Sequence, residues 1–580
     1  MTRKLIAMVL SSALLAGCAG VPTGASPTHR TTSLGALTGI DSSATDGTYS
    51  WKGIPFAAPP VGALRWRAPA DAPRWTQPRA ADRFAAACAQ TGRLYGPGRN
   101  NRYDATIGET LGQTVGSEDC LYLNVWQPAQ PAATPRPVIV FVHGGSNITG
   151  YAADPLYDGA ALARTAGAVV VTLHYRLGIF GFLDLPALKT ADPLDDSGNF
   201  ALLDIVKALE FVQANIAAFG GDPQRVTLMG QSAGAVNVYA LMTSPLLASR
   251  PQRLFHRVAA LSGGISTAAT LPPGAIPGVL PRAVWTTRGQ ALLAHALVAD
   301  GLAPDAPAAA ALATRRSAAE NAGYLRAKPA DDLLGVVRTR LTPLGLSASN
   351  PIPDGVVVAT DPIAAIRGGR YVQVPLLAGI TRDETKLFPQ LLSLRPALGG
   401  VSGRLLDDAA VFRLAHGYDA EAAPASRVED WVPAAYLSPD RPITGFDART
   451  RELNRLWFEA IRNDVLDAVR SRQDAAWAYR FDWDALPPPF DTVFGAAHTF
   501  DLPFVFGNFG PSLYSRIAFT RANEPGRLAL SRAMMQSLAA FAARGDPGVT
   551  SQPDWPAWPM LRVFDADPAR ADVTTQPYVR

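Results

Sequence analysis

Cysteine is scarce in this sequence, with three among 580 residues. Cys18 belongs to the N-terminal segment considered below, so the rest of the chain has only Cys88 and Cys120. In an oxidising compartment, two such cysteines favour a disulfide that closes a surface loop. Two buried free thiols are the alternative that the residues alone leave open.

An excess of charge of one sign is also lacking. The chain has 53 Lys and Arg against 49 Asp and Glu, a formal net charge of +4, and the two signs are interspersed. Proteins that bind nucleic acid usually concentrate basic residues on one surface. We therefore expect no nucleic-acid partner.

Long apolar runs are missing after the N-terminus. The chain begins with the basic residues Arg3 and Lys4, and a short apolar run follows from Leu5 to Cys18. This pattern is typical of a secretory signal, which is too short to span a membrane stably. Residues 15–18, Leu-Ala-Gly-Cys, resemble the bacterial lipobox, after which Cys18 would be lipidated. An ordinary signal peptide with a chance cysteine is the alternative.

These features predict three regions: a lipoprotein-type signal at 1–18, a flexible tether at 19–35 that is rich in Ser, Thr, Pro and Gly, and a single domain at 36–575. No internal repeat and no Pro/Gly-rich linker divides that domain. We expect an exported protein that is anchored to the bacterial cell envelope by its lipid, or is otherwise secreted. The lipid anchor would be its only membrane contact, and the oligomeric state stays open.

Apolar runs rich in β-branched residues recur within the domain, at residues 137–143, 168–174, 226–229, 258–261 and 374–378. Because they are continuous rather than alternating, they predict strands that are covered on both faces. Helical spacing between them, clearest at 200–217, indicates strands that alternate with helices. The fold class is therefore α/β with a mainly parallel sheet.

Alanine-rich segments at about 286–341 and 403–437 lack strand character. They predict helical insertions over the carboxyl edge of the sheet, where such folds bind ligands. Residues 457–470 and 529–543 predict further amphipathic helices, and residues 477–483 predict a late strand.

The motif Gly230-Gln231-Ser232-Ala233-Gly234 stands between an apolar run and a helical pattern. Strand, sharp turn and helix with serine at the apex form a nucleophile elbow, in which a strained backbone aims the serine hydroxyl out over the sheet. Glycine on each side suits a turn that is too tight for side chains. A tight turn without chemistry is the alternative, because the motif also occurs by chance in glycine-rich chains.

Histidine is scarce as well, and a serine nucleophile needs a base that is itself oriented by a carboxylate. Six of the seven histidines lie in the tether, at the ends of apolar strands or in helical surroundings: His29, His143, His174, His256, His295 and His416. His498 lies instead on a late loop punctuated by Gly and Pro. That position fits the chain order nucleophile, acid, histidine.

The acid has two candidates. Asp383 and Glu384 follow the apolar run at 374–378, and by position either could orient His498. A solvated surface charge is the alternative for each of them.

Donors for the oxyanion that forms on attack have candidates in two places. Gly144, Gly145 and Ser146 follow an apolar strand and have the flexible backbone needed to turn amides inward. The amide of Ala233, just after the serine, would complete the hole.

With these motifs, the sequence resembles the type B carboxylesterase family, the cholinesterase-like branch of the α/β-hydrolases. The resemblance covers roughly residues 35–575, and its most specific stretches are residues 117–126 and 215–234. Further matching stretches are residues 51–62, 175–182, 379–384 and 495–508. The resemblance implies an α/β-hydrolase fold with a mainly parallel central sheet, helices on both faces and helical insertions over the active site.

The resemblance also implies a role for each candidate in catalysis. Ser232 would be the nucleophile, Glu384 the acid and His498 the base, so the choice between the two carboxylates falls on Glu384. The backbone amides of Gly145, Ser146 and Ala233 would be the oxyanion donors, with Gly144 shaping the turn.

Other positions match architectural features of the family. Cys88 and Cys120 match its first disulfide. Four charged residues match two structural ion pairs, which are Arg65 with Glu118 and Arg176 with Asp204.

Two departures from the family pattern lie beside the serine and in the oxyanion loop. Gln231 stands where Glu is usual, and the missing charge should weaken attraction for cationic substrates and stabilise a developing imidazolium less. Ser146 replaces the third glycine of the oxyanion loop. Asn147 follows where an aromatic residue is common, and we expect it to place an amide against the acyl group.

A third departure lies in the loop between Cys88 and Cys120, which has Tyr95 and Tyr103 but no Trp. Cholinesterases use a Trp in this loop to hold a quaternary ammonium group through its π face. Choline esters are therefore not expected as substrates.

The sequence predicts a serine carboxylic ester hydrolase of the carboxylesterase type, which cleaves neutral small-molecule esters through an acyl-serine intermediate and needs no metal or organic cofactor. A lipase or an amide-cleaving hydrolase with the same triad is an alternative, and so is a non-catalytic adhesion protein of the family. The complete triad argues against the last. The physiological ester stays open, because its pockets come from the helical insertions.

Overall fold

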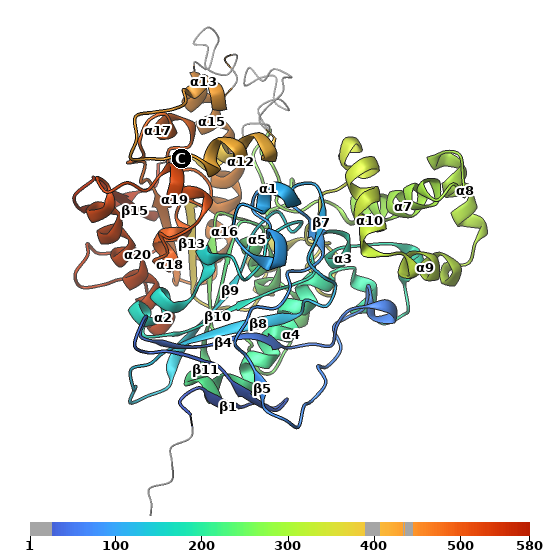
Figure 1. Cartoon of the computed structure of the whole chain (residues 1–580), viewed down its shortest axis with the longest axis horizontal. Coiled ribbons are helices and arrows are strands. Elements are labelled where there is room, and N and C mark those ends of the chain that lie inside the picture. The colour runs from blue at the N-terminus through green and yellow to red at the C-terminus, as the bar shows by residue number, and fades with distance from the viewer. Residues whose placement is uncertain (1–25, 389–406, 433, 435–444, 580) are drawn as a thin grey trace, which may run out of the picture.

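The computed structural model describes residues 26–388, 407–432, 434 and 445–579 (Figure 1). The predicted signal with Cys18 and the first part of the predicted tether lie outside these residues. In the part of the chain that is described, no helix is both long and apolar enough to cross a membrane.

A central sheet of eleven strands runs through the described residues, in the order β16-β15-β14-β13-β12-β11-β9-β10-β8-β4-β3. The strands are β3 (Ile40–Ser42), β4 (Thr48–Pro55), β8 (Tyr122–Pro128), β9 (Arg136–Val142), β10 (Val169–Leu173), β11 (Gly221–Gln231), β12 (Arg257–Leu261), β13 (Leu376–Thr381), β14 (Ala476–Phe481), β15 (Met560–Ala566) and β16 (Ala571–Pro577). From β10 to β15 all neighbours pair in parallel. The edge pairs are antiparallel. The predicted mainly parallel sheet is confirmed.

The six predicted strands correspond to β9 to β14, whereas the remaining strands of the sheet were not predicted. The outermost strand β16 shows the reason. Its residues are half-buried or exposed along its whole length, so it carries no continuous apolar run.

Helices cover both faces of the sheet. They include α2 (Ala160–Ala166), α4 (Phe200–Asn215), α5 (Ala233–Met242), α16 (Ala460–Arg470), α18 (Leu502–Phe506) and α20 (Glu524–Arg544). The predicted helices at 200–217, 457–470 and 529–543 correspond to α4, to η12 (Arg455–Glu459) with α16, and to α20.

Alternate side chains of each strand enter different cores, because successive residues of a strand point to opposite faces. In β9, Val138, Val140 and Val142 join the core that contains α4, α5 and α16. Ile139 and Phe141 join the core that contains α2, α18 and α20. Continuous apolar strands therefore mark a sheet with a helical layer on each side.

The predicted insertion at 286–341 is a group of four helices: α7 (Arg282–Ala299), α8 (Ala306–Arg315), α9 (Ala318–Ala327) and α10 (Ala330–Val336). Their buried residues, which include Leu292, Leu297, Leu325 and Leu333, share a third core with residues from outside the insertion, such as Phe180 and Phe200. In Figure 1 they extend to one side of the sheet. In the second predicted insertion, α12 (Asp408–His416) and α13 (Val428–Trp431) are described, and residues 403–406, 433 and 435–437 lie outside the described residues.

The prediction of a flexible tether at 19–35 is wrong for its C-terminal part. Residues 29–31 form β1 (His29–Thr31), which pairs with β2 (Ala36–Thr38). Trp51 Nε1 donates to the carbonyl oxygen of Thr28 (2.8 Å), and the amide of Ser33 donates to Asn215 Oδ1 (2.7 Å). A composition rich in Ser and Thr stays ordered here because distant side chains supply its hydrogen-bond partners.

Cys88 and Cys120 form a disulfide, as predicted. Both cysteines are buried in the core that contains α4 and α5.

Candidate active site

Ser232 lies at the apex of the turn between β11, which ends at Gln231, and α5, which begins at Ala233. Its backbone has φ 57° and ψ −124°, a conformation that residues with a side chain rarely adopt. The amide of Ser232 donates to the carbonyl oxygen of Leu261 (2.8 Å) at the end of β12. The predicted strand, turn and helix are present, and they place the serine at the carboxyl end of the parallel strands.

Two glycines make this turn sterically possible. A Cβ atom on Gly230 would lie 2.4 Å from the carbonyl oxygen of Gly234, and one on Gly234 would lie 2.1 Å from that of Val142. Both contacts are far inside van der Waals separation. A side chain at Gly230 would therefore push β11 away from the start of α5, and one at Gly234 would push α5 away from β9.

His498 lies on the loop after β14 and is joined to Glu384, the residue that begins the turn η9 (Glu384–Leu387) after β13. Nδ1 of His498 contacts Oε2 of Glu384, and Oε1 accepts a hydrogen bond from the amide of Thr381 (2.8 Å). Both side chains are buried. Since a carboxylate only accepts, the contact assigns the imidazole proton to Nδ1 and leaves Nε2 as an acceptor.

Nε2 of His498 faces the turn that carries the serine. It lies 3.2 Å from Nε2 of Gln231, the residue before Ser232. Among the described residues no hydrogen bond joins Ser232 to His498. Contacts of this kind are often long in substrate-free sites and shorten when substrate binds.

The carboxylate beside Glu384 has a different task. Oδ2 of Asp383 accepts from the amide of Ala496 (3.1 Å) and from Arg382 Nε (3.0 Å), and the amide of Asp383 donates to the carbonyl oxygen of Ala496 (3.0 Å). Asp383 therefore fastens the loop that carries the histidine. Position in the sequence left both carboxylates open, and the contacts place Glu384 against His498.

The other described histidines stand apart from this arrangement. Burial lowers the pKa of His143 to about 4 and that of His174 to about 3, so both are neutral near pH 7. His256 does not lie in helical surroundings as expected. It stands in the turn before β12, where its amide donates to the carbonyl oxygen of Val226 (2.7 Å).

The loop at 144–147 lies against the serine turn. A Cβ atom on Gly144 would be 2.8 Å from both Ser232 Cβ and the Gln231 carbonyl oxygen. Among the described residues the amides of Gly145 and Ser146 have no hydrogen-bond acceptor. The amide of Ala233 belongs to the first turn of α5, where helical amides lack intrahelical partners. These amides are available to a ligand oxygen beside Ser232.

Gln90 joins Thr149 and Gly150, which follow this loop, to Cys88 of the disulfide. Its Oε1 accepts from Thr149 Oγ1 (2.8 Å) and the amide of Gly150 (2.9 Å), and its Nε2 donates to the carbonyl oxygens of Cys88 (2.9 Å) and Gly150 (3.0 Å). Both the oxygen and the nitrogen of this buried side-chain amide therefore have hydrogen-bond partners.

The expectation that Asn147 places its amide against an acyl group is wrong. Asn147 is fully buried, and its side chain pairs with Asn237 on α5 and with Asn350. Its direction depends on those distant partners, which a loop motif does not reveal.

Sequence reasoning missed three residues near the histidine. The rings of Phe388 and Phe458 lie 5.0 and 5.1 Å from that of His498. Asp501 is buried and accepts from the hydroxyl of Tyr479 (2.8 Å), and burial together with the charge of Glu384 raises the pKa of Asp501 to about 6. Aromatic residues in an amphipathic pattern are usually core residues, so no sequence pattern indicated that Phe388 and Phe458 lie beside His498. For Asp501, the only signal was its position three residues after His498 in the sequence.

The two ion pairs expected to be architectural are present. Arg65 Nε donates to Glu118 (2.7 Å), and Arg176 binds Asp204 through two hydrogen bonds of 2.7 and 2.8 Å. Arg65 also donates to the carbonyl oxygen of Lys328 (2.7 Å) at the junction of α9 and α10. In the described ranges, no three His, Cys, Asp or Glu side chains lie together as a metal site would require.

A mainly parallel sheet between two helical layers, with serine on a strained turn after a central strand and histidine and acid on later loops, defines an α/β-hydrolase. The carboxylesterase family model matches residues 26–566. The chain therefore belongs to the carboxylesterase family, and it is a carboxylic ester hydrolase.

Curated relatives and solved structures agree with this placement. The chain is 32% identical over 513 residues to the para-nitrobenzyl esterase of Bacillus subtilis, covering 88% of this chain and 89% of that one. It is 32% identical over 540 residues to the fumonisin B1 esterase of Sphingopyxis macrogoltabida, covering 91% and 84%. A structure titled PNB esterase has a TM-score of 0.68 at 27% identity and 95% and 97% coverage. The carboxylesterase EST55 of Geobacillus stearothermophilus has a TM-score of 0.67 at 27% identity and 95% and 98% coverage.

Proposed function

We propose that this chain cleaves uncharged carboxylic esters with Ser232 as the nucleophile, His498 as the general base and Glu384 as the orienting acid. One arrangement carries the proposal: His498 contacts Glu384 through Nδ1, while its Nε2 faces the turn that presents Ser232. A base held in one tautomer beside a serine hydroxyl is what activation of that hydroxyl requires.

The reaction proceeds in two halves. As Ser232 Oγ attacks the ester carbonyl carbon, Nε2 of His498 takes its proton, and Glu384 stabilises the imidazolium. The tetrahedral intermediate collapses by breaking the bond to the alcohol oxygen, which leaves with the proton from His498. Water then attacks the acyl-serine in the same way, and the carboxylic acid is released with Ser232 regenerated.

The oxyanion of each tetrahedral intermediate would be held by the amides of Gly145, Ser146 and Ala233, with Gly144 shaping the turn. The support is their position against Ser232 and the absence of other acceptors for the two loop amides in the described structure. Preorganised donors of this kind are each worth on the order of 10²–10³ in kcat.

The preference for uncharged esters rests on Gln231. Its side chain is a neutral amide that lies beside His498 and is only 1% exposed, so no carboxylate adjoins Ser232 on the β11 side. Para-nitrobenzyl esters are suitable test substrates, because a relative is named for that activity.

Replacement of the nucleophile tests the assignment. Ser232→Ala should lower hydrolysis of p-nitrophenyl butyrate to below about 0.1% of wild type and abolish labelling by a fluorophosphonate probe. Ser244→Ala is a matched control, because Ser244 is a buried serine just beyond the far end of α5 whose hydroxyl has no described partner. Retention of more than a few per cent of activity by Ser232→Ala would exclude the mechanism.

For localisation, we propose an exported protein that is lipidated at Cys18 and anchored to the cell envelope. The support is the basic and apolar pattern of residues 1–18 with the lipobox-like ending. Cys18→Ser should move the esterase from the membrane fraction to the soluble fraction of the expressing bacterium. Unchanged membrane association of Cys18→Ser would contradict the lipid anchor.

A further inference from the structure

The oxyanion loop has an unusual backbone. Three consecutive residues have positive φ, with 98° at Gly145, 56° at Ser146 and 58° at Asn147. Glycine adopts such angles freely, and asparagine tolerates them better than most residues, but serine does not. A loop of this conformation needs support from its surroundings.

Asn147 supplies that support through its backbone carbonyl oxygen and through both polar atoms of its side chain. Its carbonyl oxygen accepts from the amide of Gly178 (2.6 Å), and its Oδ1 accepts from Asn237 Nδ2 (2.8 Å). Its Nδ2 donates to Oδ1 of Asn237 and to Oδ1 of Asn350, at 3.3 Å each. Each of the three side-chain nitrogens donates at least one hydrogen bond and each of the three oxygens accepts one, which fixes the orientation of the side-chain amides.

The hydrogen-bond partners of Asn147 lie on two different parts of the protein, the helix α5 and the base of the helical insertion. Asn237 stands on α5, the helix that begins directly after Ser232, and is fully buried. Asn350 follows the helical insertion, and its Nδ2 donates to the carbonyl oxygen of Gly278, which precedes the insertion (2.8 Å). Asn147 thus connects the loop to the nucleophile helix and to the base of the insertion.

We propose that three asparagines, Asn147, Asn237 and Asn350, are positioning residues that set the oxyanion donors against the nucleophile turn. The inference rests on the proposed oxyanion hole at Gly145 and Ser146. Because reciprocal hydrogen bonds join Asn147 to the helix that carries Ser232, the donors and the nucleophile keep one relative position.

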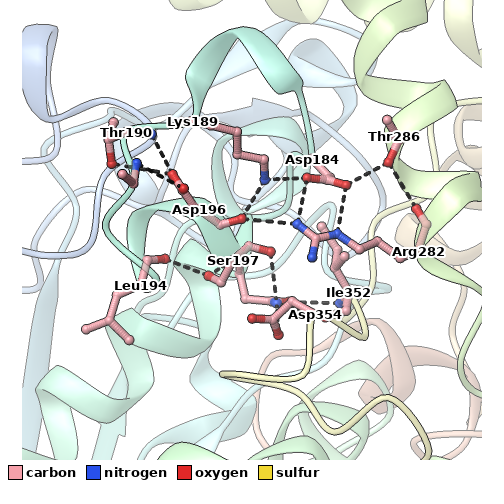
Figure 2. A network of polar contacts seen from close by, with 12 residues as sticks. Asp184, Lys189, Thr190, Leu194, Asp196, Ser197, Arg282, Thr286, Ile352 and Asp354 are labelled. Carbon is pink, nitrogen blue, oxygen red and sulfur yellow. Dashed lines mark hydrogen bonds and ion pairs between the residues drawn. The ribbon is translucent and has the colours of Figure 1, made fainter.

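The base of the insertion is itself held firmly, so Asn350 is a fixed support. Figure 2 shows polar contacts at the base of the insertion, in which Asp184 accepts from Arg282 and Thr286 at the start of α7 (3.1 and 2.7 Å). Just after Asn350, the amide of Ile352 donates to Asn199 Oδ1 (2.8 Å). Both ends of the insertion are therefore fastened to the segment at 184–199.

Three variants test the proposal by kcat, KM and the affinity of a trifluoromethyl ketone, which becomes an oxyanion when Ser232 adds to it. Asn237→Ala and Asn147→Gly should lower kcat about 10-fold to 100-fold with KM within about threefold, since a misplaced donor acts mainly on the transition state. Asn350→Ala removes one hydrogen bond to Asn147 and should cost less, about three- to tenfold. In each variant the inhibition constant should rise by the same factor as kcat/KM falls.

Asn321→Ala is the matched control, because Asn321 is a buried asparagine whose Nδ2 donates to the carbonyl oxygen of Ala313 within the insertion (2.8 Å). It should lower the melting temperature and leave kcat unchanged. Folded Asn237→Ala with kcat within twofold of wild type would overturn the proposal, and so would an unchanged inhibition constant. If Asn237→Ala does not fold, kcat and the inhibition constant of Asn350→Ala are compared with wild type instead, because Asn350 is only half-buried.

Fluorophosphonate labelling of Ser232 in the wild type separates this proposal from the proposed function. Labelled wild type with unaffected variants would overturn the positioning role alone. Wild type that does not react with the probe would overturn the proposed function, and with it the positioning role.

Discussion

Replacing Gln231 with glutamate should shift the pH dependence of hydrolysis. In the structure, Nε2 of Gln231 donates toward Nε2 of His498 at 3.2 Å, and Gln231 is buried. The side-chain amide of Gln231 carries no charge that could attract an imidazolium. A carboxylate in the same place would accept from the imidazolium and favour it.

The size of the shift follows from the geometry. Two opposite charges about 4 Å apart at an effective dielectric constant of about 20 attract by about 4 kcal/mol, equivalent to about 3 pH units. Burial of the new carboxylate and its repulsion from Glu384 oppose this attraction. We therefore expect the acid limb of the profile of kcat/KM against pH to move upward by about 1–2 units in Gln231→Glu.

The assay is hydrolysis of p-nitrophenyl butyrate from pH 5 to pH 9. Gln224→Glu is the matched control, because Gln224 is an exposed glutamine near the start of β11 and gains the same charge far from the site. A choline ester compared with its neutral 3,3-dimethylbutyl analogue gives a second readout, and Gln231→Glu should raise the relative rate of the cation. An acid limb that moves by less than about 0.3 units would refute the reasoning.

Further expectations concern acid stability, the disulfide loop and the N-terminus. His143 and His174 have pKa values lowered to about 4 and about 3, against 6.5 unfolded, so the folded chain binds fewer protons and loses stability as pH falls below 6.5. Together the two shifts lower the free energy of unfolding by about 5 kcal/mol at pH 4.5. Replacing one of the two histidines, in His174→Gln, should therefore flatten the dependence of the urea midpoint on pH. An unchanged slope would contradict this contribution of His174. Gln90→Leu should lower both kcat and the melting temperature by loosening the oxyanion loop, and wild-type kcat would show that the link to the disulfide is dispensable. Deleting residues 1–35 should lower the melting temperature by several degrees relative to deleting residues 1–25, because β1 and its buried contacts are lost; equal melting temperatures would contradict a stabilising role for β1.

The central strands and the serine turn were predictable because their signals are local. A parallel strand covered on both faces is a continuous apolar run, and the elbow at Ser232 needs only a strand, small flanking residues and a helix within a short stretch. The outer strand β16 and the strand β1 lacked such signals, because their residues are exposed or half-buried and form no continuous apolar run. Composition alone therefore placed the start of the fold too late.

The residues by themselves determined the nucleophile turn, the late histidine and a choice between two adjacent carboxylates. The fold decided that Glu384 meets His498, although 114 positions separate them, while Asp383 fastens the histidine loop. It also turned Asn147 away from the substrate and toward the nucleophile helix. Backbone preference acts over a few residues, whereas the direction of a buried polar side chain depends on which distant group can satisfy its hydrogen bonds.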